Sequence, residues 1–439
     1  MKKERGKPMG KNKSKIGFLS IILLGFNAIV GSGIFLLPNK AMELIGPASL
    51  YVILFDAFLT ITIALCFAEM GGMFKRNGGP YVYTREAFGN FAAFEVGIMT
   101  YAICVIAWAT MAVGFTTALS VFWPAADHGM TKDVIVVLFL IALGVLNIVG
   151  VNFTKIIMNI ATIGKIIPLI IFIGAGVFFM KLHNFTPLFP HGVYTHGSFG
   201  AAALLIFFAF TGFESIALAA EDMDNPSKNI PIAIVIVMII VSIVYILIQA
   251  VSIGILGPNL AKDVTPVTTA SSLFLGSWGG ILVSLGVLVS IIGINVASSF
   301  SSPRMAVALA EDGLLPKSLT KYGRFQTPYL AITLTVVLTI PIALSGSFTH
   351  LALISAISRF AQYLPTCLAV PVLRWKKPEM ERSFKIPLGP VIPIIAVLVS
   401  LWILCQSSSQ QIIWGLGGLI IAIPLYFLMK IYNKKERSF

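Results

Sequence analysis

The chain has 439 residues, of which 57% are hydrophobic and 11% are charged. Soluble domains carry about 25% charged residues and about 45–50% apolar residues, so this composition excludes a soluble globular protein and indicates a polytopic membrane protein. The formal net charge is +13, but the basic residues flank apolar segments, as cytoplasmic loops do, and therefore do not indicate nucleic-acid binding.

Twelve apolar segments follow one another along the chain. A helix needs about 20 apolar residues to cross the bilayer. By that rule the predicted spans are residues 16–39, 47–71, 91–122, 133–151, 156–180, 198–220, 230–256, 279–302, 328–345, 350–373, 388–408 and 411–431. Residues 1–15 and 432–439 are predicted cytoplasmic tails. No small-residue cleavage site follows the first segment, so we interpret it as an uncleaved helix.

Basic residues are distributed asymmetrically among the predicted loops. The outer loops contain Lys40, Lys132, Lys181 and Lys262. The predicted cytoplasmic segments contain the N-terminal cluster, Lys75, Arg76, Arg85, Lys155, Lys228, the basic residues from Arg304 to Arg324 and from Arg374 to Lys385, and Lys434, Lys435 and Arg437. This asymmetry predicts that both termini are cytoplasmic, that the number of spans is even, and that the protein lies in the cytoplasmic (plasma) membrane.

The first span is interrupted near its middle by Gly31, Ser32 and Gly33. Each glycine weakens a helix by about 1 kcal/mol relative to alanine. In hydrocarbon, interrupted backbone is tolerated only where it lines a cavity or is buried in protein. The alternative interpretation is a kinked helix, or a packing face of small residues.

The sixth span is interrupted in a similar way. Thr211 and Gly212 weaken the helix there, and Glu214 places a carboxylate in the apolar run. Paired breaks in corresponding spans of two halves are the best sequence indicator of a transporter's binding site. We therefore expect a transport core at residues 16–373, with inverted repeats at about 16–180 and 198–373. Helices 11 and 12, at residues 388–431, would lie outside the repeats.

Five motifs occur along the chain in an order that identifies a family. They are Gly31-Ser32-Gly33-Ile34-Phe35; Ala68-Glu69-Met70 with Gly78-Gly79-Pro80-Tyr81-Val82-Tyr83; Phe208-Ala209-Phe210-Thr211-Gly212-Phe213-Glu214; Glu221-Asp222-Met223-Asp224-Asn225-Pro226 with Ile230-Pro231; and Pro303-Arg304-Met305 with Ala310-Glu311-Asp312-Gly313-Leu314-Leu315-Pro316 and Thr327-Pro328. Over about residues 16–430 the chain resembles the amino acid–polyamine–organocation (APC) transporters. The resemblance implies an all-α, leucine-transporter-like fold: twelve transmembrane helices in a 5+5 inverted repeat plus two C-terminal helices, with helices 1 and 6 broken.

Broken helices suit a zwitterionic amino acid. The N-terminus of a half-helix offers unpaired N–H groups and a partial positive charge to a carboxylate. The C-terminus of a half-helix offers unpaired carbonyls to an ammonium. We therefore predict that Gly31, Ser32 and Gly33 hold the substrate carboxylate. Carbonyls near Ala28 and Ile29, and near Phe208 and Phe210, would hold its ammonium. The predicted substrate-binding residues are Ala28, Ile29, Gly31, Ser32, Gly33, Ile34, Ile103, Trp108, Phe208, Ala209, Phe210 and Gly212.

The aromatic and apolar members of this set bear on gating and selectivity. In the family that the chain resembles, an aromatic at the position of Phe208 covers the substrate as an outer gate; the alternative is an ordinary core phenylalanine. The stretch from Ile103 to Trp108 on the third span offers no partner for a charged side chain, and Trp108 would shorten the pocket. These residues favour a neutral amino acid.

Lys165 is the most informative charge, because it lies about ten residues into the fifth span. An ionisable residue at that depth is a functional hypothesis by default. The resemblance implies that this lysine takes the place of a sodium ion, with carbonyls near Ile29 and hydroxyls such as Ser298 or Ser299 as partners. A lysine in a low-dielectric site can lose its proton at neutral pH, so Lys165 could carry one proton per cycle. Alternatively, it stays charged and ties helices 1, 5 and 8 together.

Three more charged residues lie within apolar segments. Glu214 is either a proton site linked to the inner gate or a carboxylate satisfied by neighbouring groups. Arg359 either pairs with a carboxylate or faces an aqueous vestibule. Together they keep charged substrates open as an alternative. Asp56 has no role that the sequence assigns.

The sequence thus predicts a secondary active amino acid transporter, not an enzyme, that works by alternating access. Proton symport is the favoured mechanism, with Lys165, Glu214, Ser298 and Ser299 as the proton-coupling residues. A sodium-independent exchanger is the alternative, and a cationic amino acid or polyamine transporter is a further one. The chain has no nucleotide-binding or nucleophile-elbow motif, so we expect no cofactor. The outer-loop histidines His183, His191 and His196 are interpreted as solvated loop residues rather than metal ligands.

Overall fold

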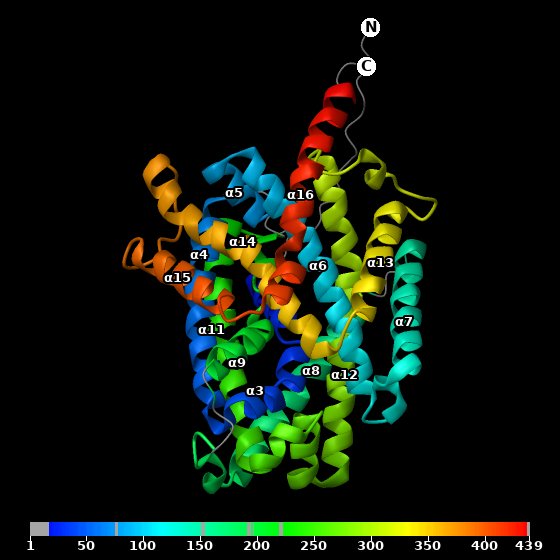
Figure 1. Ribbon diagram of the computed structural model, residues 1–439, viewed down its shortest axis with the longest axis vertical. Helices are drawn as coiled ribbons and strands as arrows, with labels where there is room; N and C mark the ends of the chain where they lie inside the picture. Colours follow the sequence, from blue (N-terminus) through cyan, green and yellow to red (C-terminus); the bar gives the residue numbers. More distant parts are fainter. Residues whose placement is uncertain are drawn as a thin grey trace.

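The computed structural model describes residues 17–74, 78–150, 154–190, 195, 197–218 and 223–436, and these ranges are helical without a β-strand (Figure 1). The helices are α1 (Phe18–Ile29), α2 (Ser32–Leu36), α3 (Pro38–Ile45), α4 (Ser49–Met73), α5 (Pro80–Phe88), α6 (Asn90–Leu119), α7 (Gly129–Val149), α8 (Thr154–Gly176), α9 (Ser198–Phe207), α10 (Glu214–Leu218), α11 (Pro226–Leu256), α12 (Pro266–Glu311), α13 (Tyr329–Leu344), α14 (Phe348–Lys376), α15 (Val391–Leu404) and α16 (Ser409–Glu436). Short 3-10 helices include η2 (Pro124–Asp127), η5 (Phe208–Phe210) and η7 (Gly257–Lys262).

Eight helical stretches in the described ranges are long and apolar enough to cross a membrane. They are Pro38–Met73, Asn90–Leu119, Gly129–Val149, Thr162–Phe179, Pro226–Lys262, Pro266–Glu311, Phe348–Lys376 and Ser409–Tyr432. The shorter apolar helices Phe18–Ile29, Ser198–Phe210, Tyr329–Leu344 and Val391–Leu404 fall in the other four predicted spans. The chain is therefore a polytopic, all-helical membrane protein, whereas the count of twelve spans and the inverted repeat stay predictions.

Three helices extend into segments that the hydropathy pattern leaves as loops. α3 and α5 both begin with a proline, Pro38 and Pro80, whose fixed φ suits the first helical position. α12 covers 46 residues and includes the whole predicted span 279–302. It turns at Gly276, whose φ of +72° is a conformation that glycine adopts without strain.

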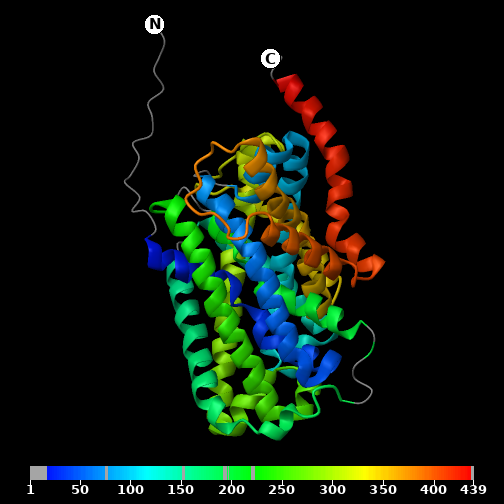
Figure 2. The same cartoon turned by 90° about the vertical axis from the view of Figure 1, so that its left-hand side faces the viewer.

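The long helices run side by side along the long axis of the molecule (Figure 2). In the interior α4 packs against α11, and α8 packs against α12. α7 and α13 form a pair at one edge, as Figure 1 shows. α15 and α16 pack on the outside of the bundle. α15 contacts α14 and α4, and α16 contacts α14 and α6. The residues at the two interruptions are buried, Val30 and Ser32 in the first and Thr211 and Phe213 in the second, so both breaks lie within the protein.

Some predicted features lie outside the described residues. These are residues 1–15 and 437–439 of the predicted tails, residue 16 of the first predicted span, Lys75 and Arg76 of a basic loop, His191 and His196, and Glu221 and Asp222 of the fourth motif.

Candidate functional site

The first break lies between α1 and α2, at Val30 and Gly31. α1 ends at Ile29, and both break residues have extended backbone (φ −73°, ψ 96° and φ −129°, ψ −151°). α2 then starts at Ser32, so its first N–H groups have no partner within the helix. Among the described residues, no loop hydrogen bond begins at the N–H of Gly31, Ser32 or Gly33. The predicted carboxylate-binding residues thus present free donors.

The second break lies between η5 and α10, at Thr211, Gly212 and Phe213. Thr211 leaves the helical region (ψ 155°), and Gly212 has a φ of +119°. The hydroxyl of Thr211 donates to the carbonyl of Phe208, the first residue of η5, over 2.7 Å, and the Thr211 N–H donates to the same carbonyl over 3.2 Å. Glycine is needed at 212 because an L residue rarely adopts this φ.

The two breaks pack directly against each other. A β-carbon on Gly33 would lie 2.9 Å from the α-carbon of Ala209. A β-carbon on Gly212 would lie 2.9 Å from the carbonyl carbon of Ala28. Each break therefore uses a glycine to approach the backbone of the other, and the structure brings the predicted residues of both breaks together.

Tyr245 on α11 bridges the breaks, although no sequence motif marks it. Its side chain is fully buried, and its hydroxyl oxygen lies 3.2 Å from the Ile29 carbonyl and 2.9 Å from the Ala209 carbonyl. The ring also packs edge-on against Phe210, with centroids 5.0 Å apart. The hydroxyl proton is thus shared between carbonyls of the two breaks. The available signal was that Tyr245 is the one aromatic residue in the mostly aliphatic stretch 230–256.

Lys165 on α8 holds the C-terminal end of α1. Its side chain is 1% exposed, and its ammonium donates to the carbonyls of Asn27 (3.1 Å) and Val30 (2.8 Å). Asn27 belongs to the last turn of α1 and Val30 follows the end of the helix, so neither carbonyl has a partner within α1. Asn27 also donates to the Thr162 hydroxyl over 2.5 Å, one turn before Lys165. α8 is therefore attached to the first break by two side chains.

Ser298 and Ser299 lie on α12, but they make no hydrogen bond to Lys165 within the described ranges. The hydroxyl of Ser299 donates instead to the Val296 carbonyl of its own helix over 2.8 Å. The Ser299 carbonyl accepts from Asn147 on α7 over 2.5 Å. In this conformation Ser299 thus connects α12 to α7 rather than to α8.

Glu214 is the centre of a buried polar cluster beside the second break. One carboxylate oxygen accepts from the N–H of Gly212 and from the hydroxyl of Tyr363, each over 2.9 Å. The other forms an ion pair with Arg359 and lies 3.4 Å from the amide nitrogen of Gln362. Arg359 therefore pairs with a carboxylate, which was one of its two predicted environments. The cluster attaches the break to α14.

Phe208, Phe348 and Met111 lie beside the breaks. The Phe208 ring packs edge-on against Phe348, with centroids 6.1 Å apart. Met111 on α6 accepts a hydrogen bond from the Ser32 hydroxyl at its sulfur over 3.2 Å. Trp108, three residues earlier on α6, is fully buried, as is Ile103. Met111 thus connects α6 to the first break, and no sequence motif marks it.

Asp56 on α4 is fully buried, and neither carboxylate oxygen has a hydrogen-bond partner in the described part of the chain. An unpaired carboxylate in such a place is costly when ionised. We therefore treat Asp56 as neutral in this conformation.

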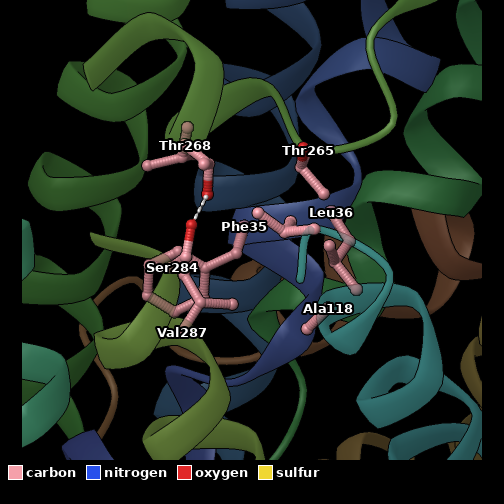
Figure 3. A pocket seen from close by; sticks show the side chains of 9 residues that line it. Phe35, Leu36, Ala118, Thr265, Thr268, Ser284 and Val287 are labelled. Carbon is pink, nitrogen blue, oxygen red and sulfur yellow. Dashed lines mark hydrogen bonds between the residues drawn. The ribbon is translucent and has the colours of Figure 1, made fainter. Parts of the chain in front are cut away.

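A small crevice of about 10 Å³ lies beside α2. It is lined by residues of α2, of α12 and of the end of α6, together with Val121 and Thr265. Figure 3 shows Thr268 and Ser284 pointing toward each other across it, with their hydroxyl oxygens 3.2 Å apart. These residues belong to the two arms of α12 on either side of Gly276. The crevice has room for about one water molecule, so it is too small for a substrate.

A polytopic helical protein whose two interrupted helices meet in its interior has the architecture of a membrane transporter. The amino acid permease family model matches residues 16–429, and the chain belongs to that family. It is 32% identical to an uncharacterised transporter of Mycobacterium tuberculosis, over 94% of this chain and 90% of the relative. It is 31% identical to the serine/threonine exchanger SteT of Bacillus subtilis, over 95% of this chain and 97% of the relative. It is 28% identical to the branched-chain amino acid permease BcaP of the same organism, over 97% of this chain and 94% of the relative.

Proposed function

We propose that this amino acid permease is a secondary active transporter of neutral amino acids that works by alternating access. The observation that carries the proposal is the direct packing of the two breaks, Gly33 on Ala209 and Gly212 on Ala28. Neither helix is continuous at this point. A movement of one broken helix therefore changes which of its backbone groups the other broken helix contacts. A substrate bound there would be exposed to one side of the membrane at a time.

The substrate zwitterion is assigned to the two faces of these breaks. Its carboxylate is placed at the N–H groups of Gly31, Ser32 and Gly33, which lack partners among the described residues. Tyr245 already engages the carbonyls of Ile29 and Ala209. The ammonium is therefore assigned to the remaining predicted carbonyls, those of Ala28 and Phe210.

A neutral side chain is supported by the charges around the breaks. Glu214 and Arg359 neutralise each other, so neither is left to select a charged substrate. Met111, which contacts the first break, is apolar. Two of the relatives are named for branched-chain amino acids and for serine and threonine, which are neutral. A cationic amino acid or polyamine is correspondingly less favoured.

Proton coupling is assigned to Lys165. Its ammonium has two carbonyl acceptors and, within the described ranges, no carboxylate partner. An ammonium whose acceptors are neutral carbonyls gives up its proton more readily than one that is paired with a carboxylate. Movement of α1 would withdraw both carbonyls together and release the proton, so substrate and proton would move together.

A sodium-independent exchanger is the second candidate, since one relative is named as an exchanger. Lys165 would then stay charged throughout the transport cycle. In either case the termini are placed in the cytoplasm and the protein in the plasma membrane.

Uptake into proteoliposomes tests the proposal. Labelled L-leucine, L-serine, L-arginine and L-glutamate are offered with and without an inward proton gradient, to vesicles that are empty or preloaded with amino acid. Gradient-driven accumulation of a neutral amino acid in empty vesicles is expected. Uptake that requires preloading would replace symport by exchange, and the absence of any uptake would contradict the transporter.

A variant pair tests the lysine. Lys165→Ala should remove the pH dependence of uptake, whereas Lys181→Ala, in the predicted outer loop, should retain it. Unchanged pH dependence in Lys165→Ala would exclude this residue as the proton carrier.

A further inference from the structure

A second cavity, which we call the outer vestibule, opens at the predicted outer end of the bundle. Its volume is about 410 Å³, within the range of small-molecule sites. Its lining residues come from the end of α2 and from α3, from the end of α6, and from η2, α7, η7 and the start of α14. No residue of the predicted substrate site lines it.

The inner end of the outer vestibule is formed by Phe348, which contacts Phe208, the predicted outer gate. Phe348 lines the cavity, and its ring packs against Phe208. A β-carbon on Gly114 would lie 3.2 Å from both the Phe348 ring and the Ser32 side chain. Phe348 therefore separates the cavity from the first break, and a molecule in the vestibule would be one aromatic layer away from it.

The walls carry charges of both signs. Lys40 and Glu43 pair with each other over 2.6 Å, so this pair is self-satisfied. Asp127, Lys132 and Lys262 also line the cavity and form no ion pair among the described residues. The cavity thus combines one available carboxylate with two available ammonium groups.

The remaining hydrogen-bonding capacity of these groups suits a small zwitterion. One oxygen of Asp127 accepts from the hydroxyls of Thr117 (3.0 Å) and Thr116 (3.4 Å), which fixes the carboxylate in place and leaves its second oxygen available. Lys132 donates to the Gly346 carbonyl over 3.2 Å and keeps two of its three N–H donors. A ligand with an ammonium and a carboxylate would satisfy both residues, and Leu36 and Phe348 offer apolar surface to its side chain.

We propose that the outer vestibule is a second amino acid site, in which Asp127 receives the substrate ammonium and Lys132 or Lys262 receives its carboxylate before the Phe208–Phe348 layer opens. This inference rests on the proposed function and adds a capture step to it. Charge-assisted hydrogen bonds to both ends of a zwitterion hold it at the mouth of the cleft, beside the aromatic layer. The vestibule should therefore lower KM without changing the maximal rate.

Initial uptake rates in proteoliposomes test this site, with L-leucine or L-serine as the probe. Asp127→Asn keeps an oxygen that accepts from Thr116 and Thr117 but removes the charge. The matched control is Asp133→Asn, because Asp133 is an exposed carboxylate six residues further on that does not line the cavity. Asp127→Asn should raise KM about threefold, the size expected for one partly exposed ion pair, with the maximal rate unchanged. Asp133→Asn should change neither value.

A second pair keeps the test decisive if Asp127→Asn does not fold. Lys262→Gln should also raise KM, and Lys181→Gln, a control in another outer loop, should not. The inference is overturned if KM does not rise in the vestibule variants, if it rises equally in the controls, or if only the maximal rate falls. Absence of uptake by the wild-type protein would instead overturn the proposed function, so the two failures are distinguishable.

Discussion

Gly212 of the second break lies against Ala28 of the first: a β-carbon on residue 212 would come within 2.9 Å of the Ala28 carbonyl carbon. The φ of Gly212 is +119°, so two independent constraints, space and backbone conformation, require glycine there. The contact makes the shape of each break depend on the other. We therefore expect the breaks to move as a coupled unit.

Gly212→Ala should reduce uptake by at least about tenfold. Positive φ costs an alanine about 1–2 kcal/mol, and the clash with Ala28 adds to it; 1.4 kcal/mol corresponds to a factor of ten. The control is Gly417→Ala on α16, where a β-carbon would meet nothing within 4 Å. Uptake per folded protein, determined after size-exclusion chromatography, is the measurement. Equal uptake by both variants would contradict the coupling of the breaks.

The breaks themselves could be predicted from the sequence because glycine acts locally. Gly31, Gly33 and Gly212 weaken a helix wherever they stand, so their positions mark the interruptions without knowledge of the fold. Lys165 could be singled out for the same reason, since a charge deep in an apolar span needs partners. The family motifs then supplied the expectation that these segments meet.

The partners across the bundle could not be predicted. Glu214 and Arg359 are 145 residues apart, and no local pattern joins them. Met111 and Tyr245 lie on helices that are apolar on all sides, so periodicity does not indicate which face is turned inward. The extra helices α3 and α5 were missed because they are too short or too polar for a hydropathy criterion. Tertiary packing decides all of these features.

Tyr245→Phe should weaken substrate binding while the protein stays folded. The substitution removes only the hydroxyl shared by the Ile29 and Ala209 carbonyls, a loss of about 1 kcal/mol or about fivefold in affinity. The ring contact with Phe210 remains. Tyr51→Phe, at an exposed position of α4, is the control. An unchanged KM for Tyr245→Phe would show that the hydroxyl does not shape the site.

The ion pair between Glu214 and Arg359 should be much more sensitive to single than to double replacement. Arg359→Met leaves a buried carboxylate without its counter-charge, which costs about 3–5 kcal/mol. Glu214→Gln with Arg359→Met leaves no charge, and the thermal stability of the double variant should exceed that of Arg359→Met alone. Tm in detergent is the measurement.

The exposed pair Lys40–Glu43 supplies the control for this cycle, because its side chains are 39% and 53% exposed. Its single and double variants should all have nearly the wild-type Tm, as expected for surface pairs. Additive losses at Glu214 and Arg359 would mean that the two side chains do not act as a pair.

Glu69 connects three segments at the predicted cytoplasmic end, and its replacement should destabilise that end. Its fully buried carboxylate accepts from Arg374 at Nε (2.8 Å) and Nη2 (2.5 Å) and from the Ile386 N–H (2.8 Å). Arg382 lies 3.8 Å from it. Glu69→Gln therefore leaves two guanidinium groups without their shared anion.

We expect Glu69→Gln to lower Tm clearly more than Glu86→Gln does. Glu86 pairs with Lys377 over 2.6 Å nearby, but both side chains are about one third exposed, so that pair is worth about 0–1 kcal/mol. Bidentate, desolvated pairs such as Glu69–Arg374 are stronger, since the charge-assisted bonds are made away from water. Because Glu69 is on α4 and Arg374 is on α14, the loss should also loosen the contact between these helices. Equal Tm values for the two variants would show that burial adds nothing to this pair.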